Sequence, residues 1–494
     1  MASVQGRNLP AGVVYARHRP EQTLLYRIVE EHYPAFHDLL AQAGRPLPNY
    51  VAREFEDFLK CGRLEHGFLR VRCEHCHHEK LVAFSCKRRG FCPSCGARRM
   101  AESAALLVDD VFPDRPVRQW VLSVPFPLRF LFANQPAVMG RVLGIVYRAI
   151  ATYSCHRAGF KAKDAHTGAV TLIQRFGSAL NLNIHFHMLF LDGAYIQMPD
   201  GKLRFRQIAP PTSQELQVLL HRITHRVAAF LERQGLLERD AENSYLTLDG
   251  LTEDDEGALP DLYGHSITYR IALGPQRGRK VFSLQTLPPH TAQHRSARLT
   301  KAAGFSLHAG VSARADQRDK LERLCRYISR PAVSEKRLSL TGNGQIRYQL
   351  KTPYRDGTTH VIFSPLDFLS RLAALVPRPR VNLTRFHGVF APNHAWRPRV
   401  TPAGRGRRAN TSVPEDAQRT PAEQRAAMTW AQRLKRVFGI DISVCEHCGG
   451  NVRVVACIED PDVICHILDH LNGVGRKVDP ATPARGPPQL DFLA

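Results

Sequence analysis

The chain has 494 residues, of which 44% are hydrophobic; this is ordinary for folded domains and excludes an intrinsically disordered protein. Its 68 Lys and Arg residues against 45 Asp and Glu give a formal net charge of +23. Such a surplus predicts an extended polyanionic partner, and nucleic acid fits best because bound cations release counterions from phosphate. The sequence contains no apolar run of about 18 residues, so we expect no membrane partner.

The first 20 residues lack the apolar segment of a signal peptide, so we expect a cytoplasmic, nucleoid-associated protein. Reduced cysteines are then metal ligands, nucleophiles or core residues rather than disulfides. Helices are predicted at 21–41 and 49–60 from their apolar spacing. Two C-x2-C pairs follow, and their separation is typical of one structural Zn²⁺ site; the predicted ligands are Cys73, Cys76, Cys92 and Cys95, with Cys86 as a further candidate.

Five cations crowd this cysteine region and are candidates for contacts with DNA phosphates: Lys87, Arg88, Arg89, Arg98 and Arg99. A zinc module can equally be a scaffold, so both roles stay open. A redox role for the two cysteine pairs is the alternative to zinc binding.

The middle of the chain predicts strands at 117–124, 169–176 and 180–192 and a helix at 137–158. The last strand alternates strictly, so one face is apolar while His185 and His187 point together from the other. Two imidazoles so placed suit one divalent metal, with Gln174 as a candidate third ligand if the two strands form a hairpin. A hydrogen-bonded, metal-free pair is the alternative.

Residues 212–238 predict a helix, 239–262 an acidic loop-rich segment, and 265–287 two short strands. The next predicted helix, 316–330, buries a stripe that consists of Leu321, Leu324, Cys325 and Ile328. Tyr327 lies on its rim beside three cations, which are Lys320, Arg323 and Arg330, and we include these among the DNA-binding candidates. An ordinary boundary tyrosine is the alternative interpretation.

The C-terminal third predicts two strands within 341–363 and a helix at 365–376. A basic linker at 397–420 precedes a small module, where Cys445 and Cys448 suggest a second zinc site. The candidates for its missing ligands lie downstream and are Cys457, Cys465, His466 and His470.

These elements together predict one reaction. The sequence has no P-loop and no G-x-G-x-x-G motif, so no nucleotide supplies energy. A divalent cation, Mg²⁺ or Mn²⁺, would polarise a DNA phosphate while Tyr327 attacks phosphorus. This attack leaves a 5′-phosphotyrosine, and a 3′ hydroxyl can later attack that bond and reverse the reaction. Nearby cations would help to deprotonate the phenol, which is protonated at neutral pH.

Three motifs in this order resemble the rolling-circle transposases of bacterial insertion sequences, whose catalytic domain belongs to the His-hydrophobic-His (HUH) superfamily. They are VRCEHCHHEKLVAFSCKRRGFCPSCGARR, NLNIHFHMLFLDG and CRYISRPAVSEKRL. The resemblance implies a metal-dependent nicking and joining enzyme that acts on single-stranded transposon ends and target DNA, with His185 and His187 as metal ligands and Tyr327 as nucleophile. Many relatives carry a second tyrosine four residues later, where this chain has Pro331, so a single-tyrosine variant is implied.

We therefore expect an α+β fold: a central antiparallel sheet carrying the histidines, with helices, including the tyrosine helix, on its other face. The expected units are an N-terminal helical segment (1–65), a zinc-binding domain (66–110), a catalytic domain (111–340) with its extension (341–396), the linker (397–420) and the C-terminal module (421–494). A plasmid replication initiator or relaxase, a zinc-ribbon DNA-binding protein and a metal-dependent hydrolase remain alternatives.

Overall fold

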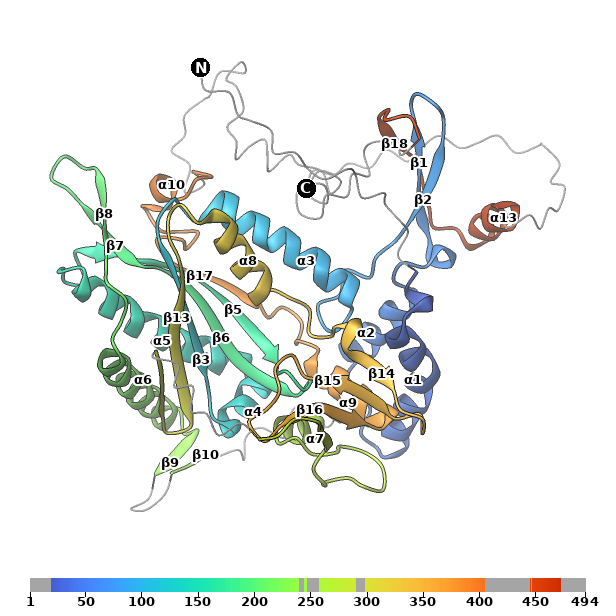
Figure 1. The fold of residues 1–494 in the computed structure, drawn as a ribbon, viewed down its shortest axis with the longest axis horizontal. Helices are drawn as coiled ribbons and strands as arrows, with labels where there is room; N and C mark the ends of the chain where they lie inside the picture. The colour runs from blue at the N-terminus through green and yellow to red at the C-terminus, as the bar shows by residue number, and fades with distance from the viewer. Residues whose placement is uncertain are drawn as a thin grey trace.

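The centre of the molecule is a six-stranded antiparallel sheet with the strand order β12-β13-β3-β6-β5-β17 (Figure 1). The computed structural model describes residues 19–239, 244–246, 257–289, 298–404, 445 and 447–471. The strands of this sheet are β3 (Val117–Ser123), β5 (Gly168–Phe176), β6 (Leu182–Leu191), β12 (Leu299–Ala302), β13 (Phe305–Ala313) and β17 (Thr384–Gly388). The expected α+β class with a central antiparallel sheet is confirmed.

The histidine strand, β6, lies between β3 and β5, and nearly all of its residues are buried. Phe186, Met188 and Phe190 of β6 are completely buried on one face of the sheet. β5 and β6 form the predicted hairpin, in which Gln174 lies opposite His185 and Leu172 opposite His187. The strand expected at 117–124 is β3, which pairs with the other edge of β6.

Different helices cover the two faces of the sheet. The apolar face of β6 packs in one cluster with residues of α4 (Phe126–Asn134), α5 (Pro136–Arg157) and α6 (Ser213–Arg233). The opposite face is covered by α3 (Pro93–Leu106) and α8 (Arg318–Ile328), which pack against each other.

The expected place of the tyrosine helix was wrong. α8 lies on the histidine face, because its apolar stripe (Leu321, Leu324, Cys325 and Ile328) joins one cluster with Leu189 and Leu191. These two leucines continue the side of β6 on which the histidines lie. One face of the sheet therefore carries both the histidines and the tyrosine helix.

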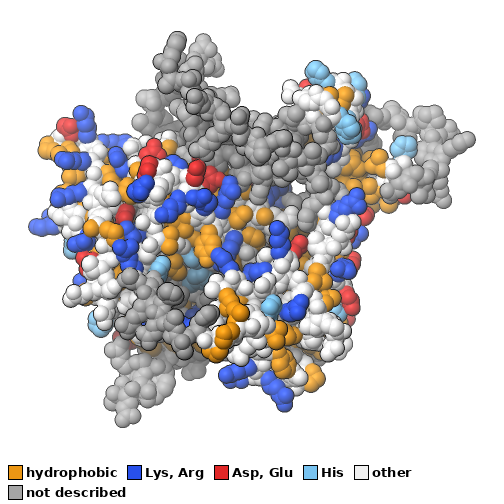
Figure 2. All heavy atoms as spheres, viewed as in Figure 1, with side chains coloured by type: hydrophobic (Ala, Val, Ile, Leu, Met, Phe, Trp, Pro, Cys, Tyr) orange, Lys and Arg blue, Asp and Glu red, His pale blue; other side chains and the backbone are white. Residues whose placement is uncertain are grey.

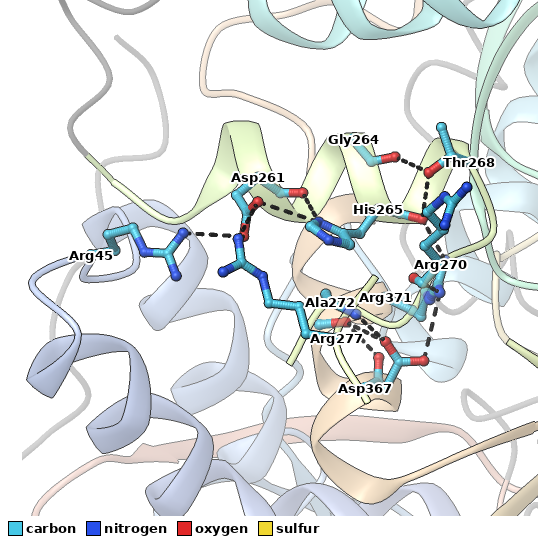
Figure 3. A network of polar contacts seen from close by, with 11 residues as sticks. Arg45, Asp261, Gly264, His265, Thr268, Arg270, Ala272, Arg277, Asp367 and Arg371 are labelled. Atoms are coloured by element: carbon cyan, nitrogen blue, oxygen red, sulfur yellow. Dashed lines mark hydrogen bonds and ion pairs between the residues drawn. The ribbon is translucent and has the colours of Figure 1, made fainter. Parts of the chain in front are cut away.

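The N-terminal helices α1 (Leu24–Gln42) and α2 (Asn49–Lys60) share the main core with α9 (Pro365–Leu375). A polar network joins this region to α7 (Leu259–Ile267), as Figure 3 shows. Asp261 forms ion pairs with Arg45 at 3.2 Å and Arg277 at 2.9 Å. At the other end of the network, the buried Asp367 carboxylate accepts a hydrogen bond from Ala272 N at 3.1 Å.

Smaller sheets surround the centre. One has the order β18-β1-β2 and is built from β1 (Phe68–Cys73), β2 (Glu79–Ala83) and β18 (Val452–Ile458), the last followed by α13 (Pro461–Leu471). A second, β11-β16-β15-β14, contains β11 (Phe282–Gln285), β14 (Leu338–Leu340), β15 (Ile346–Gln349) and β16 (Thr358–Phe363). The others are β4 (Ala165–His166) with β7 (Gly193–Gln197) and β8 (Leu203–Gln207), and β9 (Leu237–Arg239) with β10 (Ser244–Leu246).

The expected segments differ from these elements in three places. Within 265–287, α7 continues to Ile267, and β11 is the one strand formed there, with an isolated bridge between Arg270 and Lys280. β17, from the expected extension, completes the central sheet. The expected linker begins with α10 (Arg397–Val400), whereas residues 405–444 and 472–494 lie outside the described residues. No helix in the described ranges is long and apolar enough to span a membrane.

Candidate functional site

His185 and His187 converge on the face of the sheet that α8 covers. Their side chains are almost completely buried, and the two Nε2 atoms are 3.1 Å apart. Because they are two residues apart on β6, the strand geometry directs both rings to the same side. Two convergent Nε2 atoms at this spacing can share one metal ion.

The far nitrogens of both rings are held by hydrogen-bonding partners. His185 Nδ1–H donates to the Asn183 carbonyl at 2.8 Å, which leaves Nε2 free to bind a metal. His187 Nδ1 is 2.7 Å from the side-chain amide of Gln119 on β3. As placed, Gln119 Nε2–H donates to Nδ1, so the ring proton of His187 is on Nε2; when the amide is flipped, its oxygen accepts from Nδ1–H and Nε2 becomes free to bind a metal. Gln119 carried no sequence signal, because its proximity comes from strand pairing.

Burial lowers the pKa of His185 to about 4, with smaller contributions from Arg330 and Arg129. Burial also holds the pKa of His187 well below its usual value, and the neighbouring His185 and Arg330 lower this pKa further. Both imidazoles are therefore neutral at pH 7, which is the form that binds metals.

Gln174 links the histidine pair to the tyrosine helix. Its side-chain Nε2 donates to the carbonyl of Ile328, the last residue of α8, at 2.5 Å. Its Oε1 is buried and has no hydrogen-bond partner within the described part of the chain. Because a buried oxygen without a partner is costly, this atom is suited to accept a ligand on the histidine face.

Tyr327 lies on the rim of α8, next to the histidines. Its side chain is 40% exposed, and its ring is 6.4 Å from the His187 ring, edge to face. Arg330 lies 4.2 Å and Lys351 4.0 Å from the centre of the Tyr327 ring. Lys351 was missed because it follows β15, far from α8 in the sequence.

The other two cations expected beside Tyr327, Lys320 and Arg323, are exposed on α8. Figure 2 shows Lys and Arg side chains on the same side of the molecule from which Figure 1 is seen, over the region of α3 and α8. A cavity of about 120 Å³ between α3, β5 and the loop after α8 is lined by Gln174 and by four arginines, which are Arg89, Arg99, Arg175 and Arg330. The site therefore has a strongly cationic border.

The cysteines form two groups of four, and this corrects the predicted pairing. Cys92 and Cys95 meet Cys61 and Cys86, whereas Cys73 and Cys76 meet Cys445 and Cys448. The two C-x2-C pairs do not share a site, because β1 and β2 carry the first pair away from the start of α3. The candidate ligand Cys86 belongs to the first group. Cys61, which the sequence prediction missed, lies at the C-terminal end of α2. It could have been suspected because it is a further cysteine shortly before the two C-x2-C pairs.

The sulfur atoms in the first group match a tetrahedral metal site. Cys61 and Cys95 Sγ are 3.7 Å apart, Cys86 and Cys95 3.4 Å, and Cys61 and Cys92 3.8 Å. Four ligands at the usual Zn–S distance of about 2.3 Å would be about 3.8 Å apart. α3 begins in this group and packs on the loop after α8, where a Cβ on Gly96 would lie 2.6 Å from Pro331.

Most of the cations predicted near the cysteines have partners within the protein. Arg88 is paired with Asp57, Arg98 lies 3.3 Å from Glu102, and Arg99 donates to the Arg88 carbonyl at 2.8 Å. Arg89 donates to the Val381 carbonyl at 2.6 Å, whereas Lys87 is exposed. These arginines therefore fasten the cysteine region to its surroundings, and Lys87 is the most accessible of the five.

Two family models match the chain. One, described as "Putative transposase", matches residues 168–397, and the other, "Transposase zinc-binding domain", matches residues 28–124. The first covers the histidine strand and the tyrosine helix, and the second covers the first cysteine group. No curated protein and no solved structure matches the chain. Both matches agree with the insertion-sequence transposases that the motifs resemble, and they support a DNA-cleaving transposase with a zinc-binding domain on its N-terminal side.

Proposed function

We propose that this transposase nicks and rejoins single-stranded DNA through a 5′-phosphotyrosine at Tyr327, in rolling-circle transposition. The observation that carries the proposal is the placement of a half-exposed phenol against two neutral, convergent histidines, at a ring distance of 6.4 Å from His187. Two cations, Arg330 and Lys351, lie against the phenol ring and favour a phosphate substrate.

We assign a Mg²⁺ or Mn²⁺ ion to His185 and His187, with Gln174 as third ligand. The fit rests on the convergent Nε2 atoms and on Gln174 Oε1, which has no hydrogen-bond partner among the described residues. A mixed nitrogen and oxygen ligand set suits Mn²⁺ somewhat better than Mg²⁺. When bound, such an ion polarises the scissile phosphate and offsets the charge that develops on it.

In the proposed reaction, Tyr327 Oη forms a bond to phosphorus and the bond from phosphorus to the 3′ oxygen breaks. The phenol loses its proton, and the 3′ oxygen leaves as a hydroxyl group. Arg330 and Lys351 lie beside the ring and offset the negative charge of the phosphate. Attack by another 3′ hydroxyl on the phosphotyrosine reverses these bond changes and joins strands without ATP.

Tyr327 is the single nucleophile in this proposal. The position four residues later is Pro331, whose ring packs against Gly96 at the start of α3. Cys61, Cys86, Cys92 and Cys95 are the proposed structural zinc ligands that fix this start of α3. The zinc-binding domain thereby supports the loop that follows the nucleophile. Lys87 and the exposed Lys320 and Arg323 are proposed to contact the DNA backbone.

The test is a covalent trapping experiment. A pooled library of 5′- and 3′-labelled single-stranded oligonucleotides is incubated with the purified protein and Mn²⁺ or Mg²⁺, and denaturing gels reveal protein–DNA adducts. We expect an adduct that Tyr327→Phe abolishes and that the double variant His185→Ala, His187→Ala reduces by at least about a thousandfold, since a metal ion supplies several kcal/mol. Tyr354→Phe is the matched control and should leave the adduct unchanged.

The outcomes separate the alternatives. Cleavage without an adduct would indicate a hydrolase, and binding without cleavage would indicate a DNA-binding protein. An adduct that persists in Tyr327→Phe would assign the nucleophile elsewhere. Replication initiators and relaxases share this chemistry, but the family match favours transposition.

A further inference from the structure

The second cysteine group is assembled from two segments that are far apart in the sequence. Cys73 Sγ lies 3.5 Å from Cys448 Sγ, and Cys76 Sγ lies 3.5 Å from Cys445 Sγ, across separations of 375 and 369 residues. All four sulfur atoms lie within 4.8 Å of one another. These distances are close to the edge of about 3.8 Å expected for a tetrahedral Zn²⁺ site with four thiolates, and far longer than a disulfide bond of about 2.05 Å.

The backbone around this group has the form of two facing knuckles. His75 N–H points to Cys73 Sγ at 3.4 Å, and Cys445 N donates to the Gly450 carbonyl at 2.7 Å. A Cβ on Gly450 would lie 3.2 Å from Cys73 Sγ and 2.9 Å from His75 Cβ. Only glycine therefore allows the second knuckle to approach the first this closely.

The strands continue directly from the knuckles. β18 pairs antiparallel with β1, from Phe68 opposite Ile458 to Cys73 opposite Val452, and lies beside β1 in Figure 1. Glu74 N donates to the Asn451 carbonyl at 2.9 Å, which joins the end of the ladder to the cysteine group. The same contact between two distant segments thus forms both a sheet and a four-sulfur cluster.

Apolar burial is too small to explain this contact. Within β18 and α13, Ile464 is the one buried hydrophobic residue among those described, and Val454, Val463 and Leu471 are exposed. Modules with so little core usually depend on metals or disulfides for their structure. Here the four thiols can support the module by binding a metal ion. A ligand set made only of sulfur atoms selects zinc over magnesium or manganese.

We propose that Cys73, Cys76, Cys445 and Cys448 form a second zinc site, which fastens the β18–α13 segment onto the β1–β2 hairpin of the zinc-binding domain. The site is separate from the group of Cys61, Cys86, Cys92 and Cys95. It differs from the second site expected from the sequence, because its other ligands come from the N-terminal domain. The proposal is independent of the chemistry at Tyr327.

The first measurement is metal content of the full chain, purified under reducing conditions with zinc, by inductively coupled plasma mass spectrometry. We expect two zinc ions per chain in the wild type and one in the variant Cys445→Ser, Cys448→Ser. The matched control, Cys457→Ser with Cys465→Ser, removes two exposed cysteines of the same segment and should keep both ions. One ion in the wild type, an unchanged content in the first variant, or iron in place of zinc would overturn the proposal.

The second measurement is hydrogen–deuterium exchange, which reports whether the contact between β18 and β1 depends on the metal. In Cys445→Ser, Cys448→Ser, amides of 452–458 should exchange at least about tenfold faster, while peptides from β5 and β6 remain unchanged. Equal protection of 452–458 in both proteins would contradict a metal-dependent contact. Light scattering completes the test: a wild-type dimer that becomes monomeric in the variant would place the site between two chains and overturn the intrachain assignment.

Discussion

The two faces of β6 bury side chains of different kinds, apolar rings on one face and two histidines on the other. Phe186 lies in the apolar core and stacks near Phe132 with ring centres 6.2 Å apart. His185 and His187, the residues on either side of it, face α8 and are held by hydrogen bonds. One strand therefore serves stability on one face and chemistry on the other.

This difference explains how a buried polar site is tolerated. The strand is fixed by its apolar face and by ladders with β3 and β5 on both sides, so the histidines need contribute little to folding. Their burial favours the neutral form, which needs less solvation than a charged group and leaves lone pairs available. Rigid support from one face positions the ligands on the other.

The largest effect on stability is expected at Phe186, which lies on the apolar face of β6. Phe186→Ala should lower the free energy of unfolding by about 3–5 kcal/mol, because a completely buried ring leaves a cavity. Chemical denaturation measures this, with Phe186→Leu as a control that costs less than about 1.5 kcal/mol. A comparable loss in His185→Ala would contradict the division between the two faces.

His387, on the apolar face of the central sheet, provides the second test. Burial lowers the pKa of His387, on β17, to about 4. The imidazole of His387 becomes protonated near pH 6.5 in the unfolded chain, and near pH 4 in the folded chain. Its contribution to the free energy of unfolding is therefore complete above about pH 6.5 and is lost as the pH falls towards 4. We expect a loss of up to about 3 kcal/mol over this window. Denaturation curves from pH 7 to 4 should show a shallower pH dependence in His387→Phe; an unchanged slope would exclude His387 as its source.

The third test concerns Gln119, which reaches His187 from β3. Gln119→Leu should weaken Mn²⁺ binding by about 10- to 100-fold, since partners that orient a ligating histidine have effects of this size. Isothermal titration calorimetry measures the affinity, and Gln119→Glu, which keeps an acceptor for Nδ1–H, should retain it better. Equal affinity in Gln119→Leu and wild type would remove Gln119 from the metal site.

The smallest effect is expected at Lys351, which lies 4.0 Å from the centre of the Tyr327 ring. Lys351→Ala should slow adduct formation about two- to fivefold, in line with about 0.5–1 kcal/mol for an exposed cation over an aromatic ring. Single-turnover rates at saturating DNA measure this, and Lys301→Ala on β12 is a control for net charge. A slower rate in Lys301→Ala of the same size would indicate general electrostatics instead.

The sequence by itself determined the local elements. The alternation along 182–190 predicted β6 and its apolar face, and the stripe from Leu321 to Ile328 predicted α8. The two strands predicted within 341–363 correspond to β15 and β16, which pair with each other. These predictions succeeded because side-chain periodicity reports burial within one element. The proximity of His185 to His187 followed from the same periodicity.

Only the tertiary structure decided which elements meet. Cys73 and Cys76 contact Cys445 and Cys448 rather than the nearer pair, and α8 lies on the histidine face. Gln119 and Lys351 reach the site from β3 and from the loop after β15. Local patterns say which side of an element is buried but not which surface buries it. That choice depends on the packing of residues that are distant in the sequence, and periodicity within one element carries no record of it.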